Sequence, residues 1–272
     1  MKDAYYGRVD QTPEGDLLDR CAEEVALRGF AIVQGIVDPS RLAEWRKRID
    51  DVYRTQEDEF GADALDCIQD RDVCRAPLLY DRAFLELAAH PRILAIASRL
   101  LGEYHILHLQ NAIINRPERR HHQTSWHRDL PHQNFVISRP LSINTLIAID
   151  EFSVQTGATE VIPCTHRSER MPSDAFVERH GVVAAMEAGS AVVFDSMLFH
   201  RATPNRSAGP RRAINQVYTV PILKQQYDFP AALGSAPGLG DAMEQLLGYG
   251  SRVPEDDRHW RRARAARLGT GG

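Results

Sequence analysis

The feature that most constrains the fold is a change of residue pattern near Tyr104. From about residue 104 to 222 the chain consists of short alternating or β-branched runs, among them "YHILHLQNAIINRP", "PLSINTLIAIDEF", "SAVVFDSMLFH" and "RAINQVYTVPIL". Proline, glycine, asparagine and aspartate bound these runs, as is typical of short strands in a sandwich or barrel. The sequence therefore predicts a mainly β core.

The residues before this region follow helical spacing instead. Leu18, Cys21, Ala22 and Val25 fall on one face of a helix that Gly29 would end, and "FAIVQGIV" then reads as a strand. Residues 41–53 and 91–101 have the pattern of two further helices. Residues 55–81 between them are poorly patterned, and we expect them to form a mobile edge of an active site.

The sequence shows no internal repeat and no linker rich in glycine or serine. We predict one domain over residues 1–272, with a helical part at about 1–103, the β core at about 104–222, and a C-terminal helix and basic tail at about 223–272. The tail, "RHWRRARAARLGTGG", could contact phosphate or nucleic acid, but a solvated, frayed terminus is the favoured interpretation.

Composition narrows the class of partner. A formal net charge of -4 argues against a general nucleic-acid binder. The sequence has no run of about 18 apolar residues and no apolar leader in "MKDAYYGRVDQ", so we expect no membrane partner. Four cysteines without CxxC spacing are typical of reduced thiols. We predict a cytoplasmic enzyme with a small-molecule substrate; the sequence does not indicate its oligomeric state.

The stretch "TSWHRDLPHQNF" is a candidate metal site. In an extended segment His127 and Asp129 project from the same side, and His200 ends an apolar run that could lie beside them. Two imidazoles and one carboxylate on one face of an octahedron leave three positions open, the arrangement that non-haem Fe(II) uses. His-x-Asp alone is a weak signal, because it often arises by chance.

An arginine in the next strand strengthens this interpretation. Arg211 follows His200 by eleven residues, across the turn-forming segment "RATPNRSAGPR". Its planar guanidinium suits the far carboxylate of a metal-bound dicarboxylate. Arg212 should point to the opposite side of the strand.

These segments together resemble the phytanoyl-CoA dioxygenase family of Fe(II)- and 2-oxoglutarate-dependent oxygenases. The resemblance rests on "WHRD", "TGATEVIPCTHR" and "AGSAVVFDSMLFHRATPNRSAGPRRAI", with a similar opening strand in "LRGFAIVQGIVDP", and spans roughly residues 20 to 220. It implies a double-stranded β-helix, the jelly-roll or cupin-like fold, with flanking helices. The chain departs from the family at Cys164, where glycine is usual, and at Ala202, where a small hydroxyl residue is common and Thr203 follows instead.

The resemblance also implies residue roles. His127, Asp129 and His200 would hold Fe(II) as the catalytic centre, and Arg211 would bind the C5 carboxylate of 2-oxoglutarate, the cosubstrate used with O₂. Further cosubstrate contacts are expected from Gln110, Thr203 and Asn144, although a structural hydrogen bond is at least as good an explanation for Asn144 and for Asn215. Because halogenases of this type lack the carboxylate, Asp129 favours hydroxylation with release of succinate and CO₂.

Several other residues have competing interpretations. His166 reads as a turn histidine, Trp126 as core support, and His121, His122 and His132 as exposed loop residues. His132, Gln133 and Arg139 are also candidates for substrate contact.

Two alternative functions remain open from the sequence. One is an acyl-CoA 2-hydroxylase, for which "RPERRHH" at 116–122 would supply a basic groove, although a charged hairpin tip explains it as well. The other is a non-catalytic β-helix protein that binds a metal or ligand. Hydroxylation, desaturation, epoxidation and ring closure are all open to the same iron centre.

Overall fold

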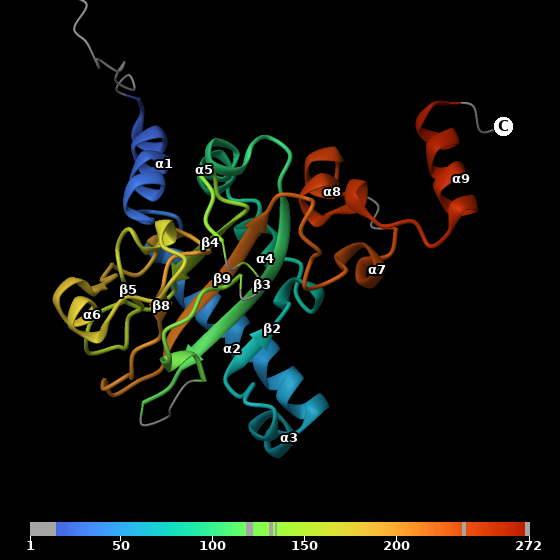
Figure 1. Cartoon of the computed structure of the whole chain (residues 1–272). Coiled ribbons are helices and arrows are strands. Elements are labelled where there is room, and N and C mark those ends of the chain that lie inside the picture. The colour runs from blue at the N-terminus through green and yellow to red at the C-terminus, as the bar shows by residue number, and fades with distance from the viewer. Residues whose placement is uncertain (1–14, 118–121, 131–132, 134, 236–237, 270–272) are drawn as a thin grey trace, which may run out of the picture.

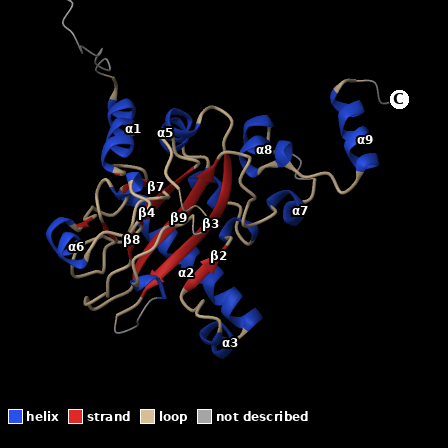
Figure 2. Cartoon of the chain, viewed as in Figure 1, coloured by secondary structure: helices blue, strands red, loops and turns tan. Residues whose placement is uncertain are grey.

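The alternating runs form four strands of a six-stranded antiparallel sheet in the computed structural model, which describes residues 15–117, 122–130, 133, 135–235 and 238–269 (Figures 1 and 2). The strand order is β1-β7-β4-β9-β3-β2. These strands are β1 (Phe30–Val33), β7 (Ala191–Asp195), β4 (Ser142–Ala148), β9 (Arg211–Thr219), β3 (Ile106–Asn115) and β2 (Val73–Arg75). The predicted mainly β core is confirmed.

A smaller sheet faces one side of this sheet. It consists of β6 (Val182–Val183), β5 (Glu160–Val161) and β8 (His200–Arg201), in the order β6-β5-β8. Apolar side chains from both sheets, among them Leu146, Val161 and Phe194, form a buried cluster between them. We call this side of the six-stranded sheet the inner face.

Helices cover the other side, which we call the helical face. These are α1 (Leu17–Arg28), α2 (Leu42–Phe60), α4 (Phe84–Ala88) and α5 (Pro91–Leu101). Trp45, Ile49 and Phe84 are buried there against Ile214 and Tyr218 of the sheet. Asp16 caps the start of α1, and Gly29, with a φ of 92°, ends it in the left-handed conformation that favours glycine. The predicted ends of α1 and α5 are confirmed.

Residues 55–81 are more regular than their sequence pattern suggests. They complete α2, form α3 (Ala62–Cys67) and the short helix η2 (Pro77–Leu79), and provide β2, which pairs with β3. A three-residue strand is too short for alternation to be recognised in a sequence. The segment therefore closes one edge of the large sheet.

The C-terminal region has three helices in its described part: α7 (Phe229–Leu233), α8 (Asp241–Leu247) and α9 (Asp257–Arg267). Buried Phe229, Leu246 and Leu247 attach α7 and α8 to the body, whereas α9 stands apart (Figure 1). The remaining short elements are η1 (Pro39–Arg41), η3 (His122–Thr124), η4 (Thr165–Arg167), α6 (Asp174–His180) and η5 (Tyr249–Ser251). Across the described ranges, no helix combines the length and the apolar character needed to cross a membrane.

Candidate metal centre

Backbone pairing brings the three predicted metal ligands together. The amide of His127 donates to the carbonyl of His200 at 3.0 Å, and the amide of His200 donates back at 3.1 Å. The amide of Asp129 donates to the carbonyl of Ser196 at 3.1 Å. The segment before β4 is thus held against the turn between β7 and β8, although some seventy residues separate the two in sequence.

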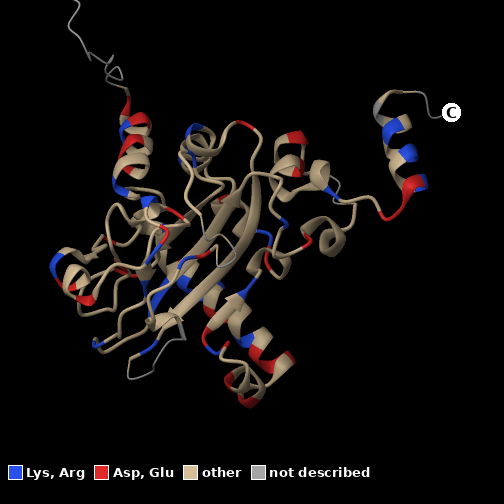
Figure 3. Ribbon diagram, viewed as in Figure 1, with Lys and Arg blue, Asp and Glu red and all other residues tan. Residues whose placement is uncertain are grey.

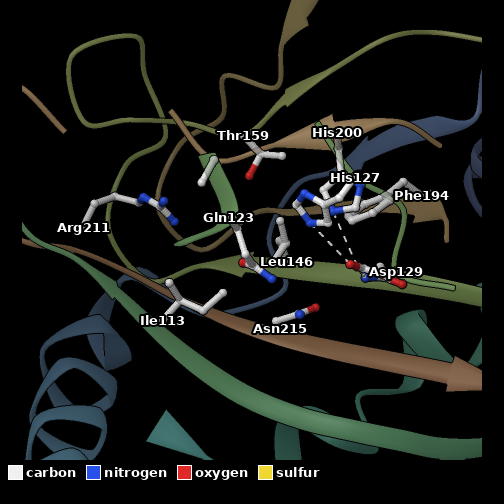
Figure 4. Close-up of a pocket in the computed structure, with 12 residues that line it drawn as sticks. Ile113, Gln123, His127, Asp129, Leu146, Thr159, Phe194, His200, Arg211 and Asn215 are labelled. Carbon is white, nitrogen blue, oxygen red and sulfur yellow. Dashed lines mark hydrogen bonds and ion pairs between the residues drawn. The ribbon is translucent and has the colours of Figure 1, made fainter. Parts of the chain in front are cut away.

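The ligand atoms of the three residues converge (Figure 4). His127 Nε2 lies 3.5 Å from Asp129 Oδ1, and His200 Nε2 lies 3.5 Å from Asp129 Oδ2. One potential ligand atom from each residue lies within 4.8 Å of the others. Such a cluster of two imidazoles and a carboxylate has the donor set of a mononuclear iron site.

The hydrogen bonds of both imidazoles favour metal binding. His127 Nδ1 lies 2.9 Å from the carbonyl oxygen of Ser125, and His200 Nδ1 lies 3.0 Å from that of Leu198. Because a carbonyl only accepts, each Nδ1 carries the hydrogen and each Nε2 keeps its lone pair for a metal. Burial lowers the pKa of His200, which favours this neutral form. His127 Nε2 is buried without a hydrogen-bond partner. The residues fit an iron ion.

Asn144 supports the carboxylate ligand. Its Nδ2 donates to Asp129 Oδ2, and its Oδ1 accepts from the hydroxyl of Ser196. Ser196 Oγ also lies 2.8 Å from the hydroxyl of Ser142, which can donate to it. This network holds the Asp129 side chain in one orientation, as is usual for carboxylates that bind metals.

Arg211 lies in the same pocket as the three ligands, and its side chain is buried with 4% of the residue exposed. Its guanidinium donates to the carbonyl of Gly157 at 3.0 Å and stacks 4.3 Å from the ring centre of Phe152. Burial lowers the pKa of Arg211 to about 10, so it remains a cation at neutral pH. No acidic side chain of the described ranges lies within ion-pair distance of it, and its Nε has no partner. A buried, unpaired cation is costly and indicates a site for an anion.

Gly157 explains part of the "TGATEV" motif. Its φ is +75°, and a Cβ there would lie 2.5 Å from the carbonyl oxygen of Thr203 and 2.6 Å from Asn115 Nδ2. Only glycine therefore brings this carbonyl to Arg211.

The pocket extends from the three ligands to Arg211 and opens to solvent. Its other lining residues are Ile113, Gln123, Asn144, Leu146, Thr159, Phe194, Ala202 and Asn215. Asn215 Oδ1 is buried without a hydrogen-bond partner and faces this space (Figure 4). The two polar ends of the pocket, the metal-ligand cluster and Arg211, suit a small dicarboxylate.

The chain matches the sequence profile of the family described as phytanoyl-CoA dioxygenase (PhyH) over residues 26–213. It belongs to this family. It is 36% identical over 249 residues to the uncharacterized protein Rv1501 of Mycobacterium tuberculosis, an alignment that covers 87% of this chain and 88% of that protein. It is 24% identical over 231 residues to the dioxygenase cdmD of Talaromyces verruculosus, with 75% and 73% of the two chains covered.

Two solved structures share the fold. EctD from S. alaskensis, with 2-oxoglutarate and 5-hydroxyectoine, has a TM-score of 0.64 at 19% identity, with 80% of this chain and 81% of that chain covered. The epimerase SnoN, in complex with Fe3+, alpha ketoglutarate and nogalamycin RO, has a TM-score of 0.60 at 18% identity, with 82% and 91% covered. The double-stranded β-helix fold expected for the PhyH family is confirmed.

Two residues that the family resemblance suggested for the cosubstrate do not line the pocket. Gln110 points to the helical face, where its Nε2 donates to the carbonyl of Phe84 at 2.9 Å and to Gln216 Oε1 at 2.8 Å. The hydroxyl of Thr203 donates to the carbonyl of Ala158 at 2.6 Å, and Ala202 lines the pocket in its place. Asn144 lines the pocket but contacts Asp129.

The sequence interpretation missed two polar lining residues, Gln123 and Thr159, as well as the apolar Ile113, Leu146 and Phe194. Thr159 stands in "TGATEV" and Gln123 precedes "TSWHRD", so both were close to motifs that had been recognised. The prediction that Arg211 and Arg212 point to opposite sides is confirmed, because Arg212 forms ion pairs with Asp50 of α2 and with Asp150.

Other predicted residues lie away from the pocket. His166 is buried and contacts the carbonyl of Ala26 at 3.2 Å, as expected of a structural turn residue. Gln133 donates to the carbonyl of Phe135 and Arg139 to that of Leu100. Trp126 is half-buried under the guanidinium of Arg201.

The charged stretch proposed for acyl-CoA is only partly described. Arg116 pairs with Asp72 at 2.6 Å. Residues 118–121, which include His121, lie outside the described residues, as do His132 and the side chain of His122.

Proposed function

We propose that this PhyH-family protein is an Fe(II)- and 2-oxoglutarate-dependent dioxygenase that hydroxylates a small-molecule substrate and releases succinate and CO₂. One observation carries the proposal: a single pocket has three converging metal ligands and, in the same lining, a buried arginine with no acidic partner among the described residues. The fold shared with EctD and SnoN, whose structures hold 2-oxoglutarate, supports it.

The chain offers a separate group for each part of the cosubstrate. His127, Asp129 and His200 would hold iron, to which the 2-oxo acid end binds. The unpaired Nε of Arg211 would donate to the distant carboxylate, giving a charge-assisted hydrogen bond in a dry site. Thr159 and Asn215 line the space between and offer a hydroxyl and an amide to its polar atoms.

When bound, iron would supply the activation of O₂ that couples oxidative decarboxylation of 2-oxoglutarate to oxidation of a substrate C–H bond. One oxygen atom enters succinate and the other enters the hydroxylated product. The chain contributes placement: Asn144 holds Asp129, and backbone carbonyls hold the imidazoles. Because Asp129 occupies its ligand position, we favour hydroxylation over halogenation.

We infer that the substrate lies along the inner face, toward β3 and β2. Asn215 is paired with Asn111 of β3, and Asn111 is paired with Arg75 of β2, so the three side chains form one row across the sheet. Tyr227 donates its hydroxyl to Asn111 Oδ1 at 2.9 Å and interacts with Arg75. Since Asp70 neutralises Arg75, this cluster suits a neutral molecule with hydroxyl or carbonyl oxygens.

A β-bulge in β3 places His108 near the row formed by Asn215, Asn111 and Arg75. The register of β3 against β9 shifts between Leu107 and Leu109, and His108 is the extra residue. Its Nδ1 is buried without a hydrogen-bond partner, burial lowers its pKa, and the charge of Asp129 acts on it in the opposite direction. His108 is therefore a neutral imidazole near the metal centre with hydrogen-bonding capacity to spare.

The first test is anaerobic addition of Fe(II) and then 2-oxoglutarate to metal-free protein, followed by visible absorption. We expect the weak charge-transfer band of the chelate in the wild type and in His180→Ala, a change on exposed α6, and no band in His200→Ala. A well-folded wild type without the band would refute the proposal. Arg75→Ala and His108→Ala should keep the band and reduce only the succinate release that a substrate stimulates.

A further inference from the structure

Arg128 stands between two of the proposed metal ligands, and its side chain binds the backbone rather than an acid. Lysines and arginines of this chain lie mainly on helices and loops (Figure 3), where many pair with acids, as Arg48 of α2 does with Asp81. The guanidinium of Arg128 donates instead to four carbonyl oxygens. Its Nε donates to Met197 at 2.8 Å, its Nη1 to Glu169 at 3.1 Å, and its Nη2 to Thr165 at 3.1 Å and to Ser168.

The four carbonyls belong to two segments that are distant in sequence. One is η4 with the residues that follow it, up to residue 169, and the other is residues 196–199, which we call the β7–β8 turn. The guanidinium centre of Arg128 lies 3.9 Å from the ring centre of Phe199 in this turn. The amide of Phe199 donates to Thr165 Oγ1 at 3.1 Å. Arg128 therefore joins the segment that contains two ligands to both of these segments.

The β7–β8 turn holds the metal ligands through consecutive carbonyl groups. The carbonyl oxygen of Ser196 accepts from the amide of Asp129 at 3.1 Å, and that of Leu198 accepts from Nδ1 of His200 at 3.0 Å. The carbonyl between these two accepts from Arg128. The position of this turn therefore sets the directions of the carboxylate and of one imidazole.

We propose that Arg128 is a positioning residue for the metal centre, which fixes the β7–β8 turn and, through it, the directions of Asp129 and His200. The inference rests on the proposed function, because it takes these two residues as iron ligands. Arg128 does not line the pocket, so it acts through the turn and not on the metal or the cosubstrate. An arginine suits this task, because its planar fork can donate to several carbonyls at once.

The charge of Arg128 has the opposite effect on iron binding. Arg128 adjoins two ligands in sequence, and its positive charge repels a divalent cation. Removal of the charge alone would therefore strengthen iron binding. Loss of the positioning contacts would weaken it, because the ligands would no longer be held in place. The sign of the change thus separates the two effects.

Anaerobic competition with a chromophoric chelator measures the Fe(II) affinity of the full-length protein. Arg128→Met keeps much of the apolar stem and removes the charge and all donors. We expect it to lower the affinity about 10-fold or more, as loss of a group that orients a metal ligand typically does. Arg128→Lys should give a smaller loss, since an ammonium group keeps the charge but cannot reach the carbonyls of both segments together. This second variant decides the question when Arg128→Met does not fold.

Arg167 provides a matched control. It also donates to backbone carbonyls, namely those of Ala26 at 2.7 Å, Ser138 at 3.1 Å and Ile137 at 3.3 Å, none of which belongs to the β7–β8 turn. Arg167→Met should lower the midpoint of thermal unfolding and leave the iron affinity unchanged. An equal loss of iron affinity in Arg167→Met and Arg128→Met would show a general effect of stability and overturn the proposal.

Asn144 tests whether Arg128 acts through the turn. Asn144 holds Asp129 and accepts from the hydroxyl of Ser196, which belongs to the β7–β8 turn. A turn displaced by Arg128→Met should already weaken this support. Asn144→Ala added to Arg128→Met should therefore lower the iron affinity by less than the product of the two single effects. A double variant that shows the full product would overturn the proposal, because the two residues would then act independently.

The wild type separates this inference from the proposed function. A wild type that binds Fe(II), with equal or higher affinity in folded Arg128→Met, would overturn the positioning role alone. A well-folded wild type that binds no Fe(II) would refute the metal centre itself, and the positioning role with it.

Discussion

Polar side chains are paired with one another on the helical face of the six-stranded sheet and are left partly unpaired on the inner face. Two adjacent residues of β9 show this contrast. Arg212 points to the helical face, where it donates to both oxygens of Asp50 at 2.8 and 2.9 Å and to Asp150 at 3.1 Å. Arg211 points to the inner face, where it donates to one carbonyl and keeps an unpaired Nε. The first guanidinium joins α2 to the sheet, whereas the second keeps a donor that an anion could use.

The same contrast holds for carboxylates and amides. Asp50 is satisfied by Arg212, whereas Asp129 faces two imidazole nitrogens that carry no hydrogen. Gln110 links β3 to α4 on the helical face, whereas Asn144 orients Asp129, which we propose as a metal ligand. Polar groups of the helical face therefore stabilise the fold, and those of the inner face are arranged for ligands.

Replacing Asp129 or Asp50 with alanine should show the largest difference between the two faces, in activity for one variant and in thermal stability for the other. Asp129→Ala should abolish iron-dependent succinate release, because it removes one of three ligands, and should leave the midpoint of thermal unfolding almost unchanged. Asp50→Ala should keep the release and lower the unfolding midpoint. Substrate oxidation that survives in Asp129→Ala would refute the metal-centre assignment.

Alanine substitution of Arg211 should affect 2-oxoglutarate binding, whereas alanine substitution of Arg212 should affect the stability of the fold. Arg211→Ala should weaken 2-oxoglutarate binding, measured by titration of the charge-transfer band, by about 10- to 100-fold, because hydrogen bonds to charged groups contribute about 1.5 to 3 kcal/mol. Arg212→Ala should leave this affinity within about twofold and reduce the free energy of unfolding, since it leaves Asp50 without its ion-pair partner, whereas Asp150 keeps Arg46. Equal effects on affinity would show that our assignment of the two faces is wrong.

The side-chain amides of Asn144 and Gln110 allow the same comparison, with a smaller expected effect on iron affinity. Asn144→Ala should lower the affinity for iron by about 10-fold or more, because it frees Asp129 to rotate. Gln110→Ala should leave iron affinity unchanged and destabilise the protein. Metal competition titration and thermal unfolding of both variants would check this, and an iron site indifferent to Asn144→Ala would contradict the supporting role.

Asp195 is a buried carboxylate outside the pocket, and its protonation should affect the stability of the fold. Burial raises its pKa from 3.8 to about 6, against the opposing hydrogen bond from the amide of Met197. The folded state therefore prefers the protonated acid, and this contribution to stability is lost as pH rises from about 4 through 6.

Asp195→Asn keeps an acceptor for Met197 without the charge. The variant should gain stability relative to the wild type above pH 6, by on the order of 1 to 3 kcal/mol, and much less at pH 4. Chemical denaturation at the two pH values measures the difference. A difference that is the same at both values would show that Asp195 titrates normally.

Much of the candidate site could be predicted from the sequence because its residues follow the alternation of an extended chain. His127 and Asp129 share a side through the alternation of an extended chain, and their backbone pairing with His200 and Ser196 follows from the end of β7. Arg211 and Arg212 separate for the same reason. Family membership added the fold that brings residues 127 and 200 together.

The misplacement of Gln110 has a structural cause. Leu107 belongs to the core of the helical face, and alternation counted from it would turn Gln110 toward the pocket. The bulge at His108 inserts one residue and reverses the alternation, so Gln110 joins Ala112 and Ile114 on the helical face. No turn residue or glycine marks this bulge in the sequence.

By itself the sequence determined which residue types could bind iron and an anion, where strands and helices alternate, and which of two neighbouring arginines shares a side with the ligands, because all of these depend on neighbours along the chain. Only the tertiary structure decided that Asn144 holds Asp129 and that Arg211 has no acidic partner in the described part of the chain. It also decided that Arg75 and His108 extend the inner face and that α9 stands apart from the body. These facts depend on strand register, on one bulge and on contacts between distant segments, which arise only when the whole sheet is assembled.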